Sequence, residues 1–153
     1  MKVTYKRESA IDCIPELEPL FEKHWEEIAH YKDIPARPDY PTYLAADAGG
    51  FLRLYTARTE DGVMIGYAVF FVRYNIHYMD SLQAMQDLLF VHPDYRKGRV
   101  GIKLIQFCDD QLRADGVQVV YQHVKLNHDF GPLLKRLGYE PVETIHGKRL
   151  DRS

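Results

Sequence analysis

The fold is decided by residues 82–124, which read LQAMQDLLFVHPDYRKGRVGIKLIQFCDDQLRADGVQVVYQHV. The apolar run at 82–91 is typical of a strand. Apolar residues then recur at three- and four-residue intervals over 100–114, which predicts an amphipathic helix, and 117–124 is again strand-like. A strand, a helix and a strand in this order form a right-handed crossover whose two strands lie parallel. We therefore expect a parallel β-α-β unit here.

The segments on either side of this unit also alternate between strands and helices. Gly62 ends a turn at 60–62 between two apolar runs, which indicates an antiparallel hairpin. The fold expected is a mixed α/β sheet, antiparallel in its N-terminal part, with helices on both faces and one domain over 1–153. The further elements expected are strands at 2–8, 51–58, 63–73 and 142–150, a turn region at 74–81, and helices from Ile14 to about Ile28, at 42–46 and at 132–137.

Composition excludes several classes of protein. The chain has 153 residues, 46% of them hydrophobic, a formal net charge of −2 and a pI near 6.4, so we expect a globular protein and no nucleic-acid partner. It lacks an apolar run of about 18 residues, so no membrane partner is expected. Because the N-terminus has no signal-peptide pattern, we expect a cytoplasmic protein. Its two cysteines show no metal-ligand spacing, and no metal site is predicted.

The loop before the predicted helix at 100–114 is basic and rich in glycine. Arg96, Lys97 and Arg99 stand around Gly98 and Gly101. The first turn of a helix leaves its N–H groups without intrahelical partners, and the helix dipole favours anions there. Glycine lets the backbone approach a phosphate closely. On spacing alone, the loop is either an anion site or a solvated connection.

The flanks of this loop favour the anion site. Val91-x-Pro93-x-x-Arg96-x-x-x-x-Gly101-x-x-Leu104 resembles the acyl-CoA-binding motif of the GNAT superfamily of N-acetyltransferases. The resemblance implies a GNAT-like fold with a parallel β-α-β acyl-CoA-binding unit. It also implies acetyl-CoA as cosubstrate.

A second motif lies downstream. Asn127 is followed eleven residues later by Gly138–Tyr139, which is similar to the family's Asn…Gly-Phe/Tyr pattern. The specific motifs together cover about residues 82–140. Two positions depart from the family pattern: Arg99 stands where the first motif glycine is usual, and Leu134 where a tyrosine often protonates the leaving thiolate.

The resemblance also implies which residues bind the cofactor. The loop amides of 96–101 would cradle the pyrophosphate, and the preceding strand would pair with the pantetheine arm. Asn127 would contact that arm, although a helix N-cap or a turn residue is an equally good reading. The cofactor-binding residues expected are Leu89, Phe90, Val91, Arg96, Lys97, Gly98, Arg99, Val100, Gly101 and Asn127.

Asp87 is the candidate general base. Expelling an unprotonated thiolate near pH 7 costs roughly 2 kcal/mol, whereas presenting an unprotonated alkylamine costs roughly 4.6 kcal/mol. A base therefore matters more than an acid, and Leu134 does not exclude catalysis. Strand alternation places Asp87 on one face with Met85, Leu89 and Val91, an apolar setting suited to a base. The other reading is a partly exposed aspartate that caps a loop.

Other candidate residues lie outside the cofactor motif. Tyr121 and His123 share a strand face and could relay a proton or bind the acceptor, or could be hydrogen-bonded core residues. Two stretches rich in aromatic and polar residues, 30–43 and 73–81, correspond to segments that commonly wall the acceptor cleft of this fold. They could equally pack only their own loops. The acceptor-lining residues expected are Tyr31, His77, Tyr78 and Asp80.

These expectations define the function. We expect an acetyl-CoA-dependent N-acetyltransferase that acylates a primary amine by direct attack in a ternary complex, with a small molecule favoured over a protein lysine or N-terminus as acceptor. The alternative is a GNAT-fold module that binds CoA or phosphate without turnover, which Arg99 and Leu134 keep open. Dimers are common in this superfamily, so a homodimer is compatible with the resemblance.

Overall fold

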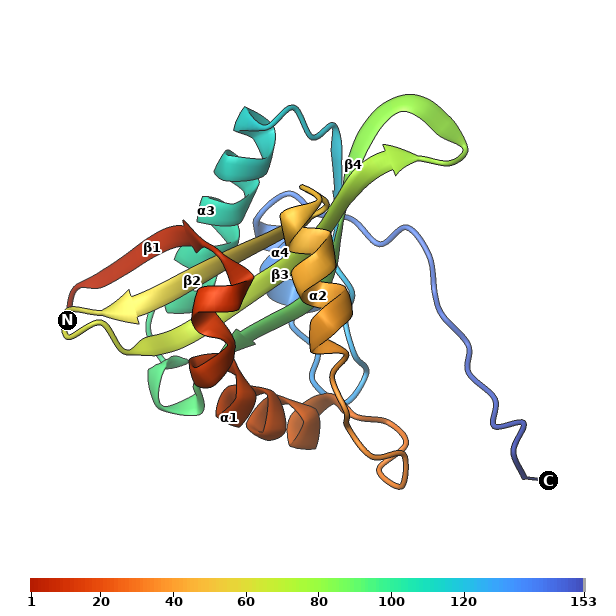
Figure 1. Ribbon diagram of the computed structural model, residues 1–153, viewed down its shortest axis with the longest axis horizontal. Coiled ribbons are helices and arrows are strands. Elements are labelled where there is room, and N and C mark those ends of the chain that lie inside the picture. Colours follow the sequence, from red (N-terminus) through yellow and green to blue (C-terminus); the bar gives the residue numbers. More distant parts are fainter. Residues whose placement is uncertain (153) are drawn as a thin grey trace.

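The computed structural model describes residues 1–152. Within this range a five-stranded sheet in the order β1-β2-β3-β4-β5 lies between helices (Figure 1). Neighbouring strands are antiparallel except β4 and β5, which are parallel. The strands are β1 Val3–Glu8, β2 Leu52–Thr59, β3 Met64–Asn75, β4 Tyr78–Val91 and β5 Val119–Tyr121. The helices are α1 Ala10–Ile28, α2 Tyr40–Ala48, α3 Val100–Ala114 and α4 Gly131–Arg136, with a 3-10 turn η1 at Pro93–Tyr95.

The predicted crossover is confirmed. α3 spans the residues expected from its periodicity and connects β4 to the parallel strand β5. Its buried residues recur every three or four positions along one face, as an amphipathic helix against a sheet requires. They are Val100, Leu104, Ile105, Cys108 and Leu112.

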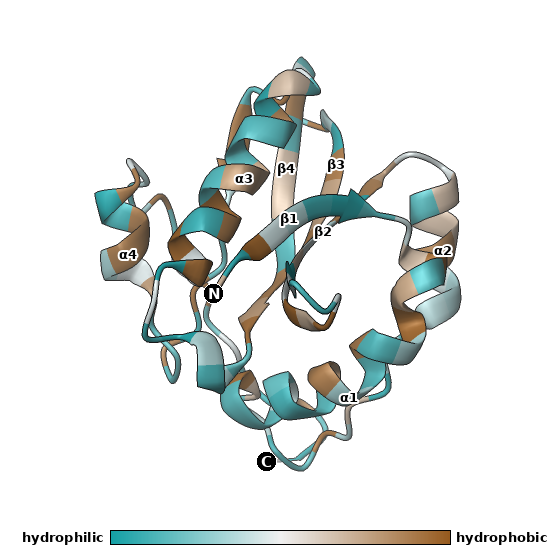
Figure 2. Ribbon diagram, turned by 90° about the vertical axis from the view of Figure 1, so that its left-hand side faces the viewer, coloured by the Kyte–Doolittle hydropathy of each residue, from teal (hydrophilic) through white to brown (hydrophobic). Residues whose placement is uncertain are grey.

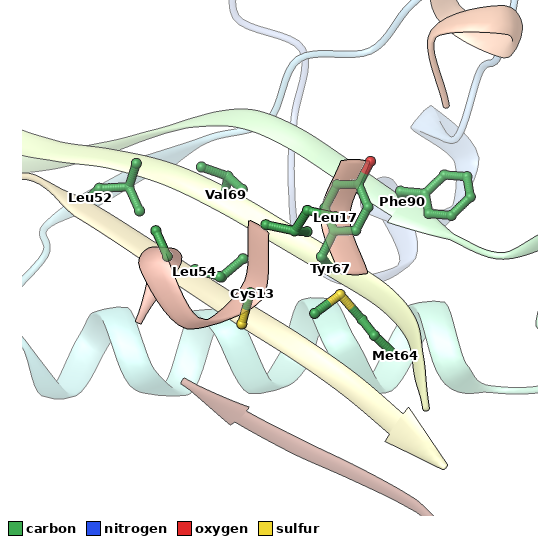
Figure 3. Packing of buried hydrophobic residues seen from close by; sticks show 9 residues of the cluster. Cys13, Leu17, Leu52, Leu54, Met64, Tyr67, Val69 and Phe90 are labelled. Atoms are coloured by element: carbon green, nitrogen blue, oxygen red, sulfur yellow. The ribbon is translucent and has the colours of Figure 1, made fainter. Parts of the chain in front are cut away.

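Two apolar layers hold the helices to opposite faces of the sheet, as predicted. One cluster joins Cys13 and Leu17 of α1 to Leu54, Tyr67 and Phe90 of the sheet (Figure 3). A second cluster joins α3 to the other face and includes Tyr55, Ala68, Phe70, Leu104 and Cys108. Figure 2 shows α3 and α4 on one side of the strands and α1 and α2 on the other. The mixed sheet with helices on both faces is the fold class expected.

α1 begins earlier than the sequence predicted and contains two prolines. Pro15 and Pro19 lie inside the helix, where each lacks an N–H to donate to the preceding turn. Figure 1 shows α1 changing direction along its length, as such gaps in the hydrogen-bond ladder allow. At the start of α1, the backbone N–H of Ala10 donates a hydrogen bond to Oδ2 of Asp47 in α2, at 2.9 Å. The two helices are thereby fixed to each other.

Three predicted boundaries are corrected. The region 74–81 is mostly strand, because β3 runs to Asn75 and β4 starts at Tyr78, so only a tight turn separates them. β5 is three residues long instead of covering 117–124. The strand predicted at 142–150 is absent from the described part of the chain. Those residues have no regular secondary structure: β5 pairs with β4 alone, and the chain at 142–150 runs away from the sheet (Figure 1).

Among residues 1–152, no helix combines the length and the apolar composition that crossing a membrane would need.

Candidate active site

The parallel strands β4 and β5 separate part-way along their length. They pair only through Gln83–Val119, Ala84–Val120 and Met85–Tyr121. β4 then continues from Gln86 to Val91 without a β5 partner in the described chain. At the point of separation, the Gln86 side chain accepts a hydrogen bond from the backbone N–H of His123, at 2.7 Å. This separation leaves one edge of β4 unpaired over its last residues, 86–91.

A bulge in β4 lies next to this separation. Val69 of β3 is opposite Leu88, and the next residue, Phe70, is opposite Gln86. Asp87 is therefore the extra residue, with no partner across the ladder. Bulges of this kind re-aim side chains and are frequent beside active sites.

The bulge reverses the alternation of β4. Leu88 and Phe90 pack in the cluster beneath α1, whereas Leu89 and Val91 pack in the cluster beneath α3. The prediction that Asp87 shares a face with Leu89 and Val91 is therefore wrong. The prediction assumed that side chains alternate strictly between the two faces of the strand. One inserted residue shifts this alternation, and the pattern along a single strand does not reveal the insertion.

Asp87 is exposed and faces α2. The hydroxyl of Tyr43 donates a hydrogen bond to its Oδ2, with an oxygen–oxygen distance of 2.5 Å. Burial, and secondarily the Asp87 carboxylate, raise the pKa of Tyr43 well above its ordinary value of 10. Sequence reasoning missed Tyr43, although it ends the aromatic-rich stretch at 30–43. The apolar setting predicted for Asp87 is replaced by a polar one at the mouth of the strand separation.

The loop at the end of β4 presents donors and positive charge. Arg99 is the N-cap of α3 and its side chain makes no cap hydrogen bond. The first N–H groups of α3 therefore lack intrahelical acceptors. Lys97, Gly98 and Arg99 are exposed, and a Cβ added to Gly98 would meet no atom within 4 Å. This donor set fits a phosphate group.

The side chain of Arg96 is held by contacts within the protein. Its Nε donates to the carbonyl of Val91 at 2.7 Å, and its terminal nitrogens both bind the carboxylate of Glu27. The guanidinium also lies over the ring of Phe90, 5.6 Å from its centroid. The hydrogen bonds from Arg96 hold the pKa of Glu27 below its ordinary value. Arg96 thus anchors the loop to α1.

The other predicted site residues differ in local structure and in burial. Asn127 is exposed in a turn closed by the hydrogen bond from His128 N to Lys125 O. The N-cap reading is excluded, since Phe130 caps α4. Tyr121 and His123 are half-buried beside the strand separation. Leu134 is buried, 6% exposed, and offers no proton.

The four predicted acceptor-lining residues do not form one cluster. The ring of Tyr31 lies beneath the guanidinium of Arg149, in the C-terminal segment, at 5.5 Å. His77 and Tyr78 lie at the exposed tip of the β3–β4 hairpin, and Asp80 follows on β4. Figure 1 shows this tip projecting away from α1.

In the described range 1–152, no three or more His, Cys, Asp or Glu side chains form a group that could hold a metal ion. The cavity between α1, α2 and the sheet has a volume of about 20 Å³ and an apolar lining that includes Leu17 and Tyr43. It has room for about one water, so it is not a substrate site.

Comparison with known families identifies the fold. The model of the acetyltransferase (GNAT) family matches residues 14–139. The chain belongs to the GNAT family. A comparison with curated proteins found no match.

Solved structures with the same fold accompany this GNAT assignment. An aminoglycoside acetyltransferase from an uncultured soil metagenomic sample, in complex with trehalose, has a TM-score of 0.75 at 16% identity, over 96% of this chain and 95% of that one. A ribosomal-protein-alanine N-acetyltransferase from Brucella melitensis biovar Abortus 2308 has a TM-score of 0.74 at 16% identity, over 98% and 100%.

A third structure contains the cosubstrate. A predicted acetyltransferase from Clostridium acetobutylicum, with acetyl-CoA, has a TM-score of 0.70 at 11% identity, over 97% of both chains. At these identities the likeness shows the fold alone. Family membership supports acyl transfer as the chemistry of this GNAT domain.

Proposed function

We propose that this protein transfers the acetyl group of acetyl-CoA to a primary amine, on a small molecule rather than a protein, by direct attack in a ternary complex. One observation carries the proposal. β4 and β5 separate beyond Met85 and Tyr121, with basic residues at one end of the opening and Asp87 at the other.

The residues present fit acetyl-CoA. The N–H groups at the start of α3, with Lys97 and Arg99, would hold the pyrophosphate. The open edge of β4 at 89–91 would hydrogen-bond the pantetheine arm as an added strand does. Asn127 would contact the arm from its turn across the opening. When bound, acetyl-CoA supplies the activated thioester.

An amine acceptor is supported by the structural neighbours. One of them, the soil aminoglycoside acetyltransferase, was also solved with sisomicin, at a TM-score of 0.74 and 16% identity. Another is named for a ribosomal-protein alanine. Both names denote acetyl acceptors that carry amines. The exposed carboxylate of Asp87 suits a cationic acceptor of this kind.

Asp87 carries the proton chemistry in this proposal. An alkylammonium loses its proton at pH 7 at a cost of roughly 4.6 kcal/mol, so a carboxylate beside it, directly or through a water, assists attack. The amine lone pair then forms the bond to the thioester carbon, and the carbon–sulfur bond breaks. The second N–H proton ends on the thiol of CoA. Tyr121 and His123, beside the separation, would hydrogen-bond the acceptor.

A non-catalytic module remains the second candidate. Leu134 is buried where the family pattern often has a tyrosine, and the guanidinium of Arg96 binds the carboxylate of Glu27. Both observations are compatible with binding of CoA without turnover.

Two measurements test the proposal. Calorimetric titration with acetyl-CoA should give micromolar binding to the wild type. Release of the CoA thiol with aminoglycosides, polyamines and peptide N-termini should then be fastest with a small cationic amine, and Asp87→Asn should lose most turnover while still binding acetyl-CoA. Binding without turnover on any amine would favour the module. A folded wild type that binds no acetyl-CoA would refute both.

A further inference from the structure

A tyrosine of α2 contacts the carboxylate that lies at the strand separation. The Tyr43 hydroxyl donates to Asp87 Oδ2 at 2.5 Å, across 44 residues of sequence. Asp87 is the bulged residue of β4, so no residue of β3 lies opposite it. Its Oδ1 has no protein donor within residues 1–152. One carboxylate oxygen is therefore held while the other faces solvent.

Tyr43 is itself fixed at both ends. Asp39 caps α2: its side chain accepts from the N–H and the hydroxyl of Thr42, at 3.1 and 2.6 Å, and its carbonyl accepts from Tyr43 N at 3.1 Å. The ring of Tyr43 stacks on Phe71 of β3, with centroids 6.0 Å apart and planes inclined by 23°. The hydroxyl is thus presented from a rigid ring.

The hydroxyl also remains a donor. Burial raises the pKa of Tyr43 above its ordinary value, so the hydroxyl keeps its proton near neutral pH. It therefore donates to Oδ2 of Asp87, and that oxygen is occupied.

We propose that Tyr43 is a positioning residue for acetyl transfer: it holds Oδ2 of Asp87 and leaves Oδ1 to take the proton of the acceptor ammonium. This inference rests on the proposed function. In the step concerned, an N–H bond of the ammonium breaks and an O–H bond forms at Oδ1. The freed amine lone pair attacks the thioester carbon, the carbon–sulfur electron pair passes to sulfur, and the sulfur receives the second N–H proton.

The chain offers a matched control. Tyr40 lies one turn earlier on α2, and its ring stacks on Phe21 with planes inclined by 11°. Its hydroxyl has no hydrogen-bond partner in the described part of the chain. Tyr43→Phe and Tyr40→Phe therefore remove the same atom from the same helix, and both retain the ring that packs.

The experiment compares Tyr43→Phe, Tyr40→Phe, Asp87→Asn and the double variant Tyr43→Phe/Asp87→Asn in the thiol-release assay. Loss of one hydrogen bond to a charged group corresponds to about a ten- to hundredfold fall in kcat. We expect that fall for Tyr43→Phe, with the KM for acetyl-CoA within about twofold of the wild type, and no fall for Tyr40→Phe. In the Asp87→Asn background, Tyr43→Phe should add less than about a twofold effect, since it acts through Asp87.

The outcomes separate this inference from the function beneath it. If Tyr43→Phe matches the wild type while Asp87→Asn is inactive, the positioning role is wrong and the base stands. An equal loss from Tyr43→Phe in both backgrounds would show that Tyr43 acts independently of Asp87, which also overturns the proposal. Full turnover by Asp87→Asn would remove Asp87 from the mechanism and this inference with it.

Discussion

The carboxylate of Glu27, near the end of α1, binds the guanidinium of Arg96, in the loop before α3. Two nitrogen–oxygen contacts of 2.7 Å join the two groups. Two-point arginine–carboxylate pairs fix orientation as well as charge. The pair lies 69 residues apart in sequence and is less than one-third exposed on either side. The helix therefore holds the loop at 96–101 in place, and in the proposed function the phosphates would be bound by Lys97, Arg99 and the backbone.

Breaking this pair should loosen the loop. Arg96→Ala and Glu27→Gln should each weaken acetyl-CoA binding by about tenfold and lower the free energy of unfolding by about 1–2 kcal/mol. Calorimetric titration and urea unfolding measure the two effects. If Arg96→Ala weakens binding and Glu27→Gln does not, Arg96 contacts the cofactor directly and the anchoring role is wrong.

The exposed basic residues should affect binding of acetyl-CoA but not the stability of the fold. Lys97→Ala and Arg99→Ala should each weaken acetyl-CoA binding by about three- to tenfold and make it less dependent on salt, because each removes one charge near the phosphates. Unfolding should be unchanged. Arg113→Ala, at the other end of α3 with a side chain 74% exposed, is the control and should affect neither quantity. Titration at two salt concentrations distinguishes these outcomes.

His24 should make the protein sensitive to mild acid. It is 5% exposed, contacts the hydroxyl of Tyr67 at 3.0 Å, and burial lowers its pKa from 6.5 to about 4. Between those pH values the unfolded chain binds a proton that the folded chain does not. Stability should fall as pH drops from about 6.5 to 4, by up to about 1.4 kcal/mol per pH unit from this group.

A variant isolates this contribution from that of the carboxylates. His24→Gln retains a polar group that can reach Tyr67 but does not titrate. Its free energy of unfolding should be below that of the wild type at pH 7.5, and the gap should narrow at pH 5. A constant gap across this range would show that His24 does not carry the acid sensitivity.

The side chain of Asp109, on α3, should stabilise the folded state more when it is uncharged. It accepts a hydrogen bond from the Tyr139 hydroxyl at 2.5 Å, and burial raises its pKa. A raised carboxylate pKa means that the folded state prefers the protonated form, so ionisation at neutral pH costs stability. Asp109→Asn retains an acceptor without the charge and should leave the melting temperature at pH 7 equal or higher. Asp109→Ala, which strands the Tyr139 hydroxyl, should lower it by several degrees.

Local patterns were sufficient for the crossover and its loop. The bounds of α3 follow from one run of apolar spacing, and the hairpin from its turn at 60–62. These features depend on residues close in sequence. The same holds for the basic loop at 96–101, whose position at the start of a helix was correctly predicted.

Contacts between distant residues escaped sequence reasoning. Tyr43 and Glu27 each act on a residue more than 40 positions away, and neither belongs to a local motif. The bulge at Asp87 depends on how β3 and β4 pair, which alternation along one strand does not encode. The prediction of a last strand was wrong for a similar reason: a strand needs a partner strand, and whether distant residues pair is not encoded in the local pattern at 142–150.

The separation of β4 from β5 also has a thermodynamic consequence. Three residue pairs join β5 to the sheet, and β5 in turn carries the connection to α4 and the C-terminal segment. A ligand lying in the opening would bridge both strands, so occupancy should raise the melting temperature, with a gain that grows with the logarithm of ligand concentration. Amide protons of β5 and of the following turn should exchange more slowly with solvent when the ligand is bound. The cosubstrate would then complete the sheet as well as take part in the reaction.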